Sequence, residues 1–323
     1  MREAMGEAML TITVLMAVRD TPPGMLRQAI ESIRGQTLRD FEFLILDDGS
    51  ARPETCAELE RQAAADSRVR LERGPPRGLT PTLNRGLALA TGELIARQDA
   101  DDWSEPDRLA RQGAFLEAHP HIALCGSNAW THRGDGRLLW ATRLPESVGA
   151  IREALWKGNP FVHGCTLFRA GLARALGGYR EEFPAAQDYD FFWRLSDAGG
   201  AVNLPVALYH YRYSAGAVSA RRAGEQARAH RAAQLLAEAR RARVAEDVAR
   251  ALARAEREAD DAGPLGTALK QIDHRLLAGD FGAAGRAYAE LLTVHPTSTL
   301  AWGKLFRWAV FAAVPRAREW CFR

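Results

Sequence analysis

The first 120 residues alternate between short apolar runs and segments with helical spacing. The run from Thr11 to Val18 is apolar and β-branched, as buried strands are. The apolar residues that follow recur at the spacing of one helix face: Met25, Leu26, Ala29, Ile30 and Ile33. The alternation continues with strands predicted at 41–46, 69–72 and 93–97 and helices at 53–65 and 79–90. Such short intervals favour a mostly parallel sheet covered by helices on both faces, so we predict an α/β fold.

The chain becomes less regular after the fourth predicted strand. Residues 104–107, Ser-Glu-Pro-Asp, combine a capping residue, an early proline and an acidic first turn, which predicts a helix from there to about Ala118. A strand is predicted at 122–125 and a turn at 134–136. We interpret the irregular stretch that runs on to Pro160 as an insertion.

The composition changes near residue 220. Residues 221–260 are dominated by Ala, Arg and Glu without Pro, which predicts a long helix or a helix pair. Residues 268–294 favour two further helices. The net charge of +3 hides an asymmetry, because residues 1–220 carry 25 Lys/Arg and 28 Asp/Glu, and residues 221–323 carry 18 and 12. We therefore expect one domain at 1–220 and a helical region at 221–323.

Three acidic segments carry the chemistry of the chain. They are residues 47–50 (Asp-Asp-Gly-Ser), 99–102 (Asp-Ala-Asp-Asp) and 187–190 (Gln-Asp-Tyr-Asp). The first two follow apolar runs and should sit at the carboxyl ends of buried strands, where open α/β sheets bind ligands. Carboxylates gathered there repel one another unless a positive group neutralises them, and a divalent cation bound to a diphosphate does so. The pattern predicts a nucleotide-dependent transferase.

These segments, in this order, resemble the family 2 glycosyltransferases, which are inverting enzymes with the GT-A fold. The resemblance runs from about Thr11 to about Ser219. It includes several connecting motifs: Gln28-Ala29-Ile30-Glu31-Ser32-Ile33, Leu83-Asn84-Arg85-Gly86, Thr91-Gly92-Glu93, Phe168-Arg169, Gly177-Gly178-Tyr179 and Tyr211-Arg212.

The resemblance assigns the first two segments to the sugar donor. It implies that Asp47, Asp48 or both hydrogen-bond the base or ribose, although Asp-Gly-Ser is also plain turn chemistry. Residues 99–101 match the Asp-x-Asp motif that holds Mn²⁺ or Mg²⁺ against the two donor phosphates and so stabilises the leaving charge. Asp101 is the expected direct metal ligand, and Asp99 contacts the ribose or a metal-bound water. Asp102 suits a helix cap as well as a functional role.

The third segment supplies the expected general base, Asp188, which takes the proton of the acceptor hydroxyl. The family usually has Glu before this Asp, whereas this chain has Gln187, which retains hydrogen-bonding capacity and loses the charge. We interpret Asp190 as structural, near the start of a helix.

Other candidate positions depart from the family pattern. The usual Pro-x-Tyr-Asn reads Ala17-Val18-Arg19-Asp20, so Ala17 and Arg19 are expected at the nucleotide without a stacking Tyr. Arg73 and Arg77 either reach the nucleotide or are solvated.

Two positions are expected on the acceptor or phosphate side. His163 lies in the segment Asn159-Pro160-Phe161-Val162-His163, which resembles the acceptor-side segment of the family, but it also suits a structural role. Arg212 matches the segment that returns over the donor phosphates, where the His that often follows two positions later is Ser214 here.

We therefore expect metal-dependent transfer of one sugar from a UDP or dTDP donor to a hydroxyl of a saccharide or lipid-linked saccharide. The Gln-x-x-Arg-Trp motif of processive synthases is absent, which favours single transfer. The alternatives are a nucleotidyltransferase and a catalytically silent nucleotide-sugar-binding scaffold. No nucleic acid is expected as a partner.

The chain shows no secretory signal and no apolar run of the ~20 residues that span a bilayer, so a cytoplasmic protein is expected. The segment from Leu300 to Arg323 interleaves aromatic and basic residues. It suits either a packed helix or a peripheral contact with the inner membrane face.

Overall fold

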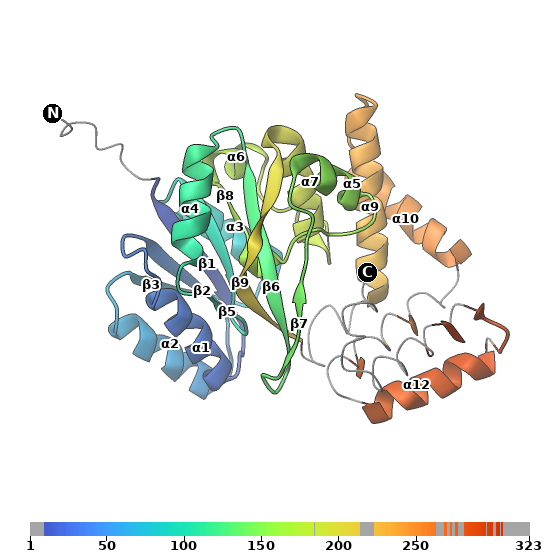
Figure 1. Cartoon of the computed structure of the whole chain (residues 1–323), viewed down its shortest axis with the longest axis horizontal. Helices are drawn as coiled ribbons and strands as arrows, with labels where there is room; N and C mark the ends of the chain where they lie inside the picture. The colour runs from blue at the N-terminus through green and yellow to red at the C-terminus, as the bar shows by residue number, and fades with distance from the viewer. Residues whose placement is uncertain are drawn as a thin grey trace. The chain divides into compact units, whose positions relative to one another are not determined.

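The computed structural model describes residues 10–183, 185–213, 223–262, 268–269, 272, 275–276, 281–294, 296–299, 302–303 and 305. The chain divides into two compact units, one of residues 1–130 with 142–211 and the other of residues 131–141 with 212–323 (Figure 1).

A nine-stranded sheet has the order β3-β2-β1-β4-β8-β6-β9-β5, and β7 pairs with β6. The strands are β1 Ile12–Val18, β2 Glu42–Asp48, β3 Val69–Gly74, β4 Leu94–Asp99, β5 Trp103–Ser104, β6 Leu124–Arg133, β7 Leu138–Thr142, β8 Leu167–Arg169 and β9 Ala201–Tyr213. Strands β3, β2, β1 and β4 pair in parallel, whereas β8 is antiparallel to β4 and β6, and β5 is antiparallel to β9. The predicted α/β fold is confirmed, but the sheet is mixed and not mostly parallel as predicted, because, in the described part of the chain, only β1, β2, β3 and β4 pair in parallel.

Helices cover both faces of the parallel strands. Helices α1 (Pro23–Arg34), α2 (Pro53–Ala64) and α4 (Arg108–Ala118) bury apolar side chains in one core cluster with alternate residues of β1 and β2. Helix α3 (Leu79–Leu89) packs on the opposite face, where Gly86 approaches the side chains of Leu15 and Leu46 too closely to leave room for a Cβ atom. Because the strand residues alternate between two covered faces, the central residues of both strands are apolar, Val14–Val18 in β1 and Phe43–Leu46 in β2.

The remaining elements of this unit follow the parallel strands. They are α5 Val148–Leu155, the 3₁₀ turn η1 His163–Cys165, α6 Ala170–Ala175 and α7 Gln187–Gly199.

The helix predicted to begin near Ser104 begins later. Ser104 lies in β5, and α4 starts at Arg108 with Asp107 as its N-cap residue. The Ser104 hydroxyl donates to the side-chain carbonyl of Gln98 (2.7 Å) and accepts from the guanidinium of Arg108 (2.9 Å). The buried Arg108 therefore recruits the hydroxyl that would otherwise cap the helix.

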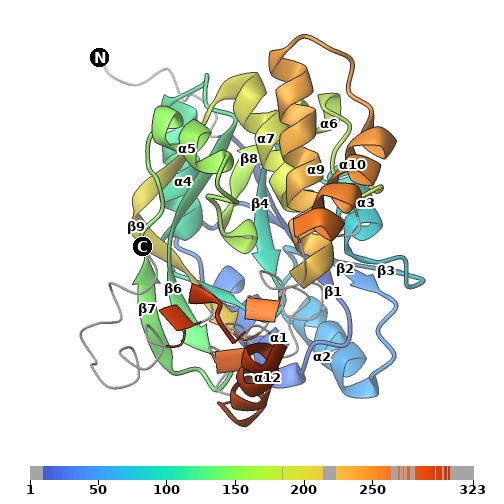
Figure 2. The ribbon, with the colours of Figure 1, turned by 90° about the vertical axis from the view of Figure 1, so that its right-hand side faces the viewer.

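The second unit contains α9 (Ala223–Arg241), α10 (Val248–Ala262) and α12 (Phe281–Val294). Residues 223–262 thus form a helix pair (Figure 2). An ion pair links Nε of Arg231 on α9 to the carboxylate of Glu258 on α10 at 2.6 Å.

Within the described ranges, no helix combines the length and apolarity needed to cross a membrane. The segment expected to contact the membrane lies outside the described residues, except at Trp302, Gly303 and Leu305.

Candidate active site

The carboxyl ends of three neighbouring strands meet at one edge of the sheet. Parallel pairing places Val18 of β1 beside Asp47 of β2, and Ala17 of β1 beside Asp99 of β4. The order β2-β1-β4 therefore puts the first two acidic segments on either side of β1. Ligands of open α/β sheets bind at such an edge.

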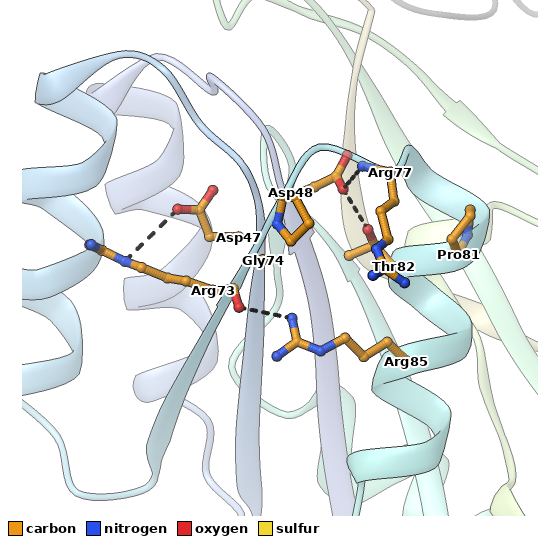
Figure 3. Close-up of a pocket in the computed structure, with 9 residues that line it drawn as sticks. Asp47, Asp48, Arg73, Gly74, Arg77, Pro81, Thr82 and Arg85 are labelled. Atoms are coloured by element: carbon orange, nitrogen blue, oxygen red, sulfur yellow. Dashed lines mark hydrogen bonds and ion pairs between the residues drawn. The ribbon is translucent and has the colours of Figure 1, made fainter.

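Asp48 shapes the loop that leads into α3. Its carboxylate, only 5% exposed, accepts hydrogen bonds from the backbone N–H groups of Arg77 (2.7 Å) and Gly78 (2.9 Å) and from the hydroxyl of Thr82 (2.9 Å) (Figure 3). The guanidinium of Arg19, an exposed residue, lies 3.7 Å from the same carboxylate. These hydrogen bonds hold the loop that leads into α3 against Asp48.

Asp47 has more capacity to accept a hydrogen bond from a ligand. It is buried, and its Oδ1 accepts from the backbone N–H of Ser50 at 2.9 Å. The Nε atom of Arg73 lies 4.0 Å from its Oδ2. The adjoining Gly49 has φ +70°, and a Cβ there would stand 2.6 Å from Cδ of Pro76. Only glycine fits this turn, which keeps the loop close to Asp47.

These carboxylates line a cavity of about 320 Å³ together with three arginine side chains (Figure 3). The Nη1 group of Arg85 donates to the backbone carbonyl of Arg73 at 3.1 Å, which fixes one wall. Small-molecule pockets begin at about this size. The lining residues are Asp47, Asp48, Arg73, Gly74, Pro75, Arg77, Pro81, Thr82 and Arg85.

Asp99, at the end of β4, is paired with a buried arginine. Its Oδ1 accepts from Nη2 of Arg97 at 2.6 Å, and its backbone N–H donates to the hydroxyl of Tyr209 at 3.2 Å. Arg97 is 1% exposed, whereas the Asp99 side chain is 28% exposed. The carboxylate is therefore held from inside the protein and still reaches solvent.

The two other carboxylates of this loop differ in exposure. Asp101 is half-buried and Asp102 is buried. In the part of the chain that the structure describes, no three His, Cys, Asp or Glu side chains form a complete metal site. A loop that presents Asp99 and Asp101 suits a cation that takes its other ligands from substrate phosphates and water.

The turn η1 lies against Asp99. A Cβ on Gly164 would stand 2.6 Å from Oδ2 of Asp99, so the backbone approaches the carboxylate directly. The neighbouring His163 is half-buried, and its Nε2 lies 3.0 Å from the hydroxyl of Tyr179. Burial, and then the positive charge of Arg97, lower the pKa of His163 to about 3. Its imidazole is therefore neutral at physiological pH.

Asp188 lies in the first turn of α7, after Ala186 in the left-handed conformation (φ 53°). Its Oδ2 accepts from Nδ2 of Asn159 at 2.8 Å. Burial raises the pKa of Asp188 to about 6, and the negative charge of Asp99 adds to the rise. Asn159, in the loop that leads into η1, contacts Asp188, and η1 lies against Asp99. The second and third acidic segments, distant in sequence, therefore come together around this turn, whereas the first segment lines the cavity described above.

Asp190, two residues further along α7, is fully buried between two arginines. Its carboxylate accepts from Nη1 of Arg180 at 3.0 Å and from Nε of Arg194 at 2.9 Å. Both oxygens are occupied by structural partners, in keeping with the structural role that we expect for Asp190.

The other candidate positions occupy different parts of the fold. Ala17 is half-buried near the end of β1, and Gln187 is half-buried at the start of α7. Arg212 is buried on β9, in the stretch grouped with the second unit. Ser214 lies outside the described residues.

Several residues of the site were assigned no role of their own by sequence reasoning, although Asn159 and Arg85 belong to segments that carry the resemblance. Arg97 reads as a member of an apolar strand, and Asn159 reads as a loop residue before a proline. Thr82 and Arg85 belong to a helix whose polar positions look solvated. An arginine inside an otherwise apolar strand was the one signal available, because such a charge needs a buried partner.

Comparison with known proteins gives the following matches. Residues 13–177 match the family described as "Glycosyl transferase family 2". The amylovoran biosynthesis glycosyltransferase AmsE of Erwinia amylovora is 32% identical over 203 residues, which cover 62% of this chain and 75% of that protein.

Two solved structures share the fold. The mannosyltransferase PcManGT from Pyrobaculum calidifontis, in complex with GDP-Man and Mn²⁺, matches with a TM-score of 0.56 at 17% identity. The match covers 96% of this chain and 82% of the PcManGT chain. S. aureus TarS 1-349 in complex with UDP matches with a TM-score of 0.53 at 18% identity. The match covers 87% of this chain and 83% of the TarS chain.

Proposed function

The chain belongs to glycosyl transferase family 2 and has the GT-A fold, and from this premise we propose an inverting, metal-dependent transfer of one sugar. The donor is a nucleoside diphosphate sugar of the UDP or dTDP type. The acceptor is a hydroxyl on a saccharide or lipid-linked saccharide. The reaction is a single displacement in which the acceptor oxygen attacks the anomeric carbon from the face opposite the leaving group.

One observation carries this proposal. Asp188, whose pKa burial raises to about 6, accepts a hydrogen bond from Asn159 in the loop that leads into η1, and η1 lies against Asp99 at the end of β4. A base and a donor-side carboxylate so close to each other suit a direct displacement, in which acceptor and donor meet between them. A base with a pKa near the operating pH is ionised and still binds a proton well, which is the best compromise for general base catalysis.

The cavity beside Asp47 supports a donor with a uracil or thymine base. The ring N–H of these bases lies between two carbonyl groups, and Asp47 retains capacity to accept a hydrogen bond from it. Arg73 and Arg77 line the same cavity. Arg19, which is exposed near the cavity, is proposed to stack on or pair with the nucleotide.

Asp101 and Asp99 are the residues that would hold Mn²⁺ or Mg²⁺. When bound, the cation supplies positive charge to the leaving diphosphate. The PcManGT structure contains Mn²⁺ with GDP-Man, and this supports a divalent cation as the cofactor of the present chain.

The acceptor side is proposed to include three further residues. His163 is neutral and half-buried and has a hydrogen-bonding partner in Tyr179. Gln187 precedes the base, and Arg212 is proposed to approach the donor phosphates. A relative named for amylovoran biosynthesis supports a role in polysaccharide biosynthesis. We propose a cytoplasmic location, with the C-terminal segment resting on the inner face of the membrane.

The test separates binding from chemistry with two variants. A panel of UDP-, dTDP- and GDP-linked hexoses first identifies the sugar nucleotide that is hydrolysed fastest with Mn²⁺. Asp101→Ala should abolish Mn²⁺-dependent UDP binding in calorimetry together with turnover. Asp188→Asn should bind UDP as the wild type does while turnover falls at least ~100-fold, the low end for loss of a general base.

The products decide between the alternatives. Release of a nucleoside diphosphate is the expected result, whereas release of a sugar 1-phosphate, which requires attack on the α-phosphorus, would indicate a nucleotidyltransferase. Binding without turnover in the wild type would indicate a silent binding protein. Retained turnover in Asp188→Asn would contradict the proposed base.

A further inference from the structure

The loop between α5 and η1 carries an asparagine that is fixed at both ends of its side-chain amide. The Nδ2 group of Asn159 donates to Oδ2 of Asp188 at 2.8 Å. Its Oδ1 accepts from the backbone N–H of Phe161 at 3.1 Å. The second bond determines which end of the amide faces Asp188, because the backbone N–H needs an acceptor and the carboxylate needs a donor.

This loop is anchored to the rest of its unit by contacts that do not involve Asn159. The backbone carbonyl of Pro160 accepts from Nδ2 of Asn203 on β9 at 3.0 Å, and Asn203 also donates to the carbonyl of Pro145 at 2.8 Å. Phe161 is buried and packs edge-on against Phe192 of α7 at 5.2 Å between ring centroids. The loop is therefore held to the helix that carries Asp188, and Asn159 adds a bond aimed at Asp188 alone.

The partner of Asp188 is neutral, and this matters for a base. Among the described residues, Asn159 supplies the one hydrogen bond from another side chain to Asp188, and no Lys, Arg or His forms an ion pair with it. A cation in this position would orient the carboxylate but would also reduce its affinity for a proton. An amide orients the carboxylate and leaves more of that affinity in place.

The charged and titratable groups near Asp188 come from the sheet, from η1 and from the loop before α7. The negative charge of Asp99 raises the pKa of Asp188. The charges of Arg97, Asp99 and Asp188 all affect the pKa of Tyr179. His163 contacts Tyr179. The charge of Asp99 disfavours the ionised carboxylate of Asp188. The backbone N–H groups of Tyr189 and Asp188 favour it, and Asn159 adds the one side-chain donor that does so among the described residues.

We propose that Asn159 is a positioning residue for the reaction, whose amide holds the Asp188 carboxylate in the orientation that receives the acceptor proton. The inference rests on the proposed function, since it takes Asp188 to be the base. The proton passes from the acceptor hydroxyl to Asp188, and Asn159 keeps its own protons throughout.

The test compares Asn159→Ala and Asn159→Asp with Asn203→Ala, which weakens the anchor of the loop and leaves the Asn159–Asp188 bond in place. The probe is the best sugar nucleotide of the panel, hydrolysed with saturating Mn²⁺ and followed as kcat against pH. Asn159→Ala should lower kcat ~10- to 100-fold, as misplaced catalytic groups do. It should also move the acid limb of the profile upward by about one pH unit, because a hydrogen bond to the ionised carboxylate is lost.

Asn159→Asp places a second negative charge beside Asp188 and should move the limb further upward than Asn159→Ala does. UDP binding with Mn²⁺ should match the wild type in both variants, and thermal unfolding checks their folding. If Asn159→Ala does not fold, Asn159→Ser is used in its place. Asn203→Ala should leave the midpoint of the limb unchanged.

Two results would overturn the positioning role: an unmoved limb in both Asn159 variants, or an equal shift in Asn203→Ala. Turnover of Asp188→Asn at the wild-type rate would instead show that the proposed base is wrong, so the two failures are distinguishable.

Discussion

The Asp188→Asn variant should turn over at least ~100-fold more slowly than the wild type and yet be more stable. Burial raises the pKa of Asp188 from its ordinary value of 3.8 to about 6, so folding disfavours the ionised carboxylate. Each factor of ten in proton affinity corresponds to about 1.4 kcal/mol, so ionised Asp188 lowers the free energy of unfolding by about 3 kcal/mol at pH 7. Asparagine carries no charge to desolvate and still accepts a hydrogen bond from Asn159.

The sign of the pH dependence follows from the raised pKa. The ionised carboxylate lowers the free energy of unfolding by its full amount at about pH 7 and above. This destabilisation decreases as the pH falls through 6, and it disappears below pH 3.8, where Asp188 is protonated in the folded and the unfolded state alike. The extra stability of the variant over the wild type should therefore fall from about 3 kcal/mol at pH 7 to less than ~1 kcal/mol at pH 4. His163, whose pKa is lowered, makes both proteins lose stability as the pH falls, and this contribution cancels in the difference.

The assay is urea unfolding of both proteins at pH 7, 6, 5 and 4, followed by tryptophan fluorescence. Asp40→Asn makes the same substitution at an exposed position and should change stability by less than ~0.5 kcal/mol at every pH. A destabilised Asp188→Asn, or a gain that does not change with pH, would refute the reasoning.

Two further predictions concern the donor side. Gly164→Ala should weaken Mn²⁺-dependent UDP binding at least ~10-fold, because the new methyl group would overlap the hydroxyl of Tyr209, which accepts from the backbone N–H of Asp99, and also Oδ2 of Asp99. The displacement of Asp99 that follows is large enough to disturb a binding site. Gly171→Ala, where a Cβ meets nothing within 4 Å, should bind UDP normally in the same calorimetric titration. Asp48→Ala should lower the free energy of unfolding by ~1–3 kcal/mol, since it leaves buried donors without an acceptor. Compared with Asp48→Ala, Asp47→Ala should lower the free energy of unfolding less and weaken UDP binding more. If Asp47→Ala were the less stable variant and Asp48→Ala the weaker binder, the roles assigned to the two carboxylates would be contradicted.

The alternation of strands and helices was predictable because local periodicity and chain connectivity determine it. The apolar runs that precede Asp47 and Asp99 require buried strands, and parallel strands end at the same edge of a sheet. For that reason the sequence by itself placed these two carboxylates at a ligand-binding edge. The resemblance to glycosyltransferases contributed the expected roles of Asp101 and Asp188, which stay predictions.

Only the tertiary structure separated residues that look equivalent in the sequence. Adjacent Asp47 and Asp48 differ because the loop before α3 folds back onto Asp48 and uses its oxygens. Ser104 reads as a helix cap, but the burial of Arg108 draws its hydroxyl into a polar network. The pairing of Asn159 with Asp188 joins a loop to a distant helix. Hydrogen bonds of this kind depend on which segments pack together, and local sequence patterns carry no record of that packing.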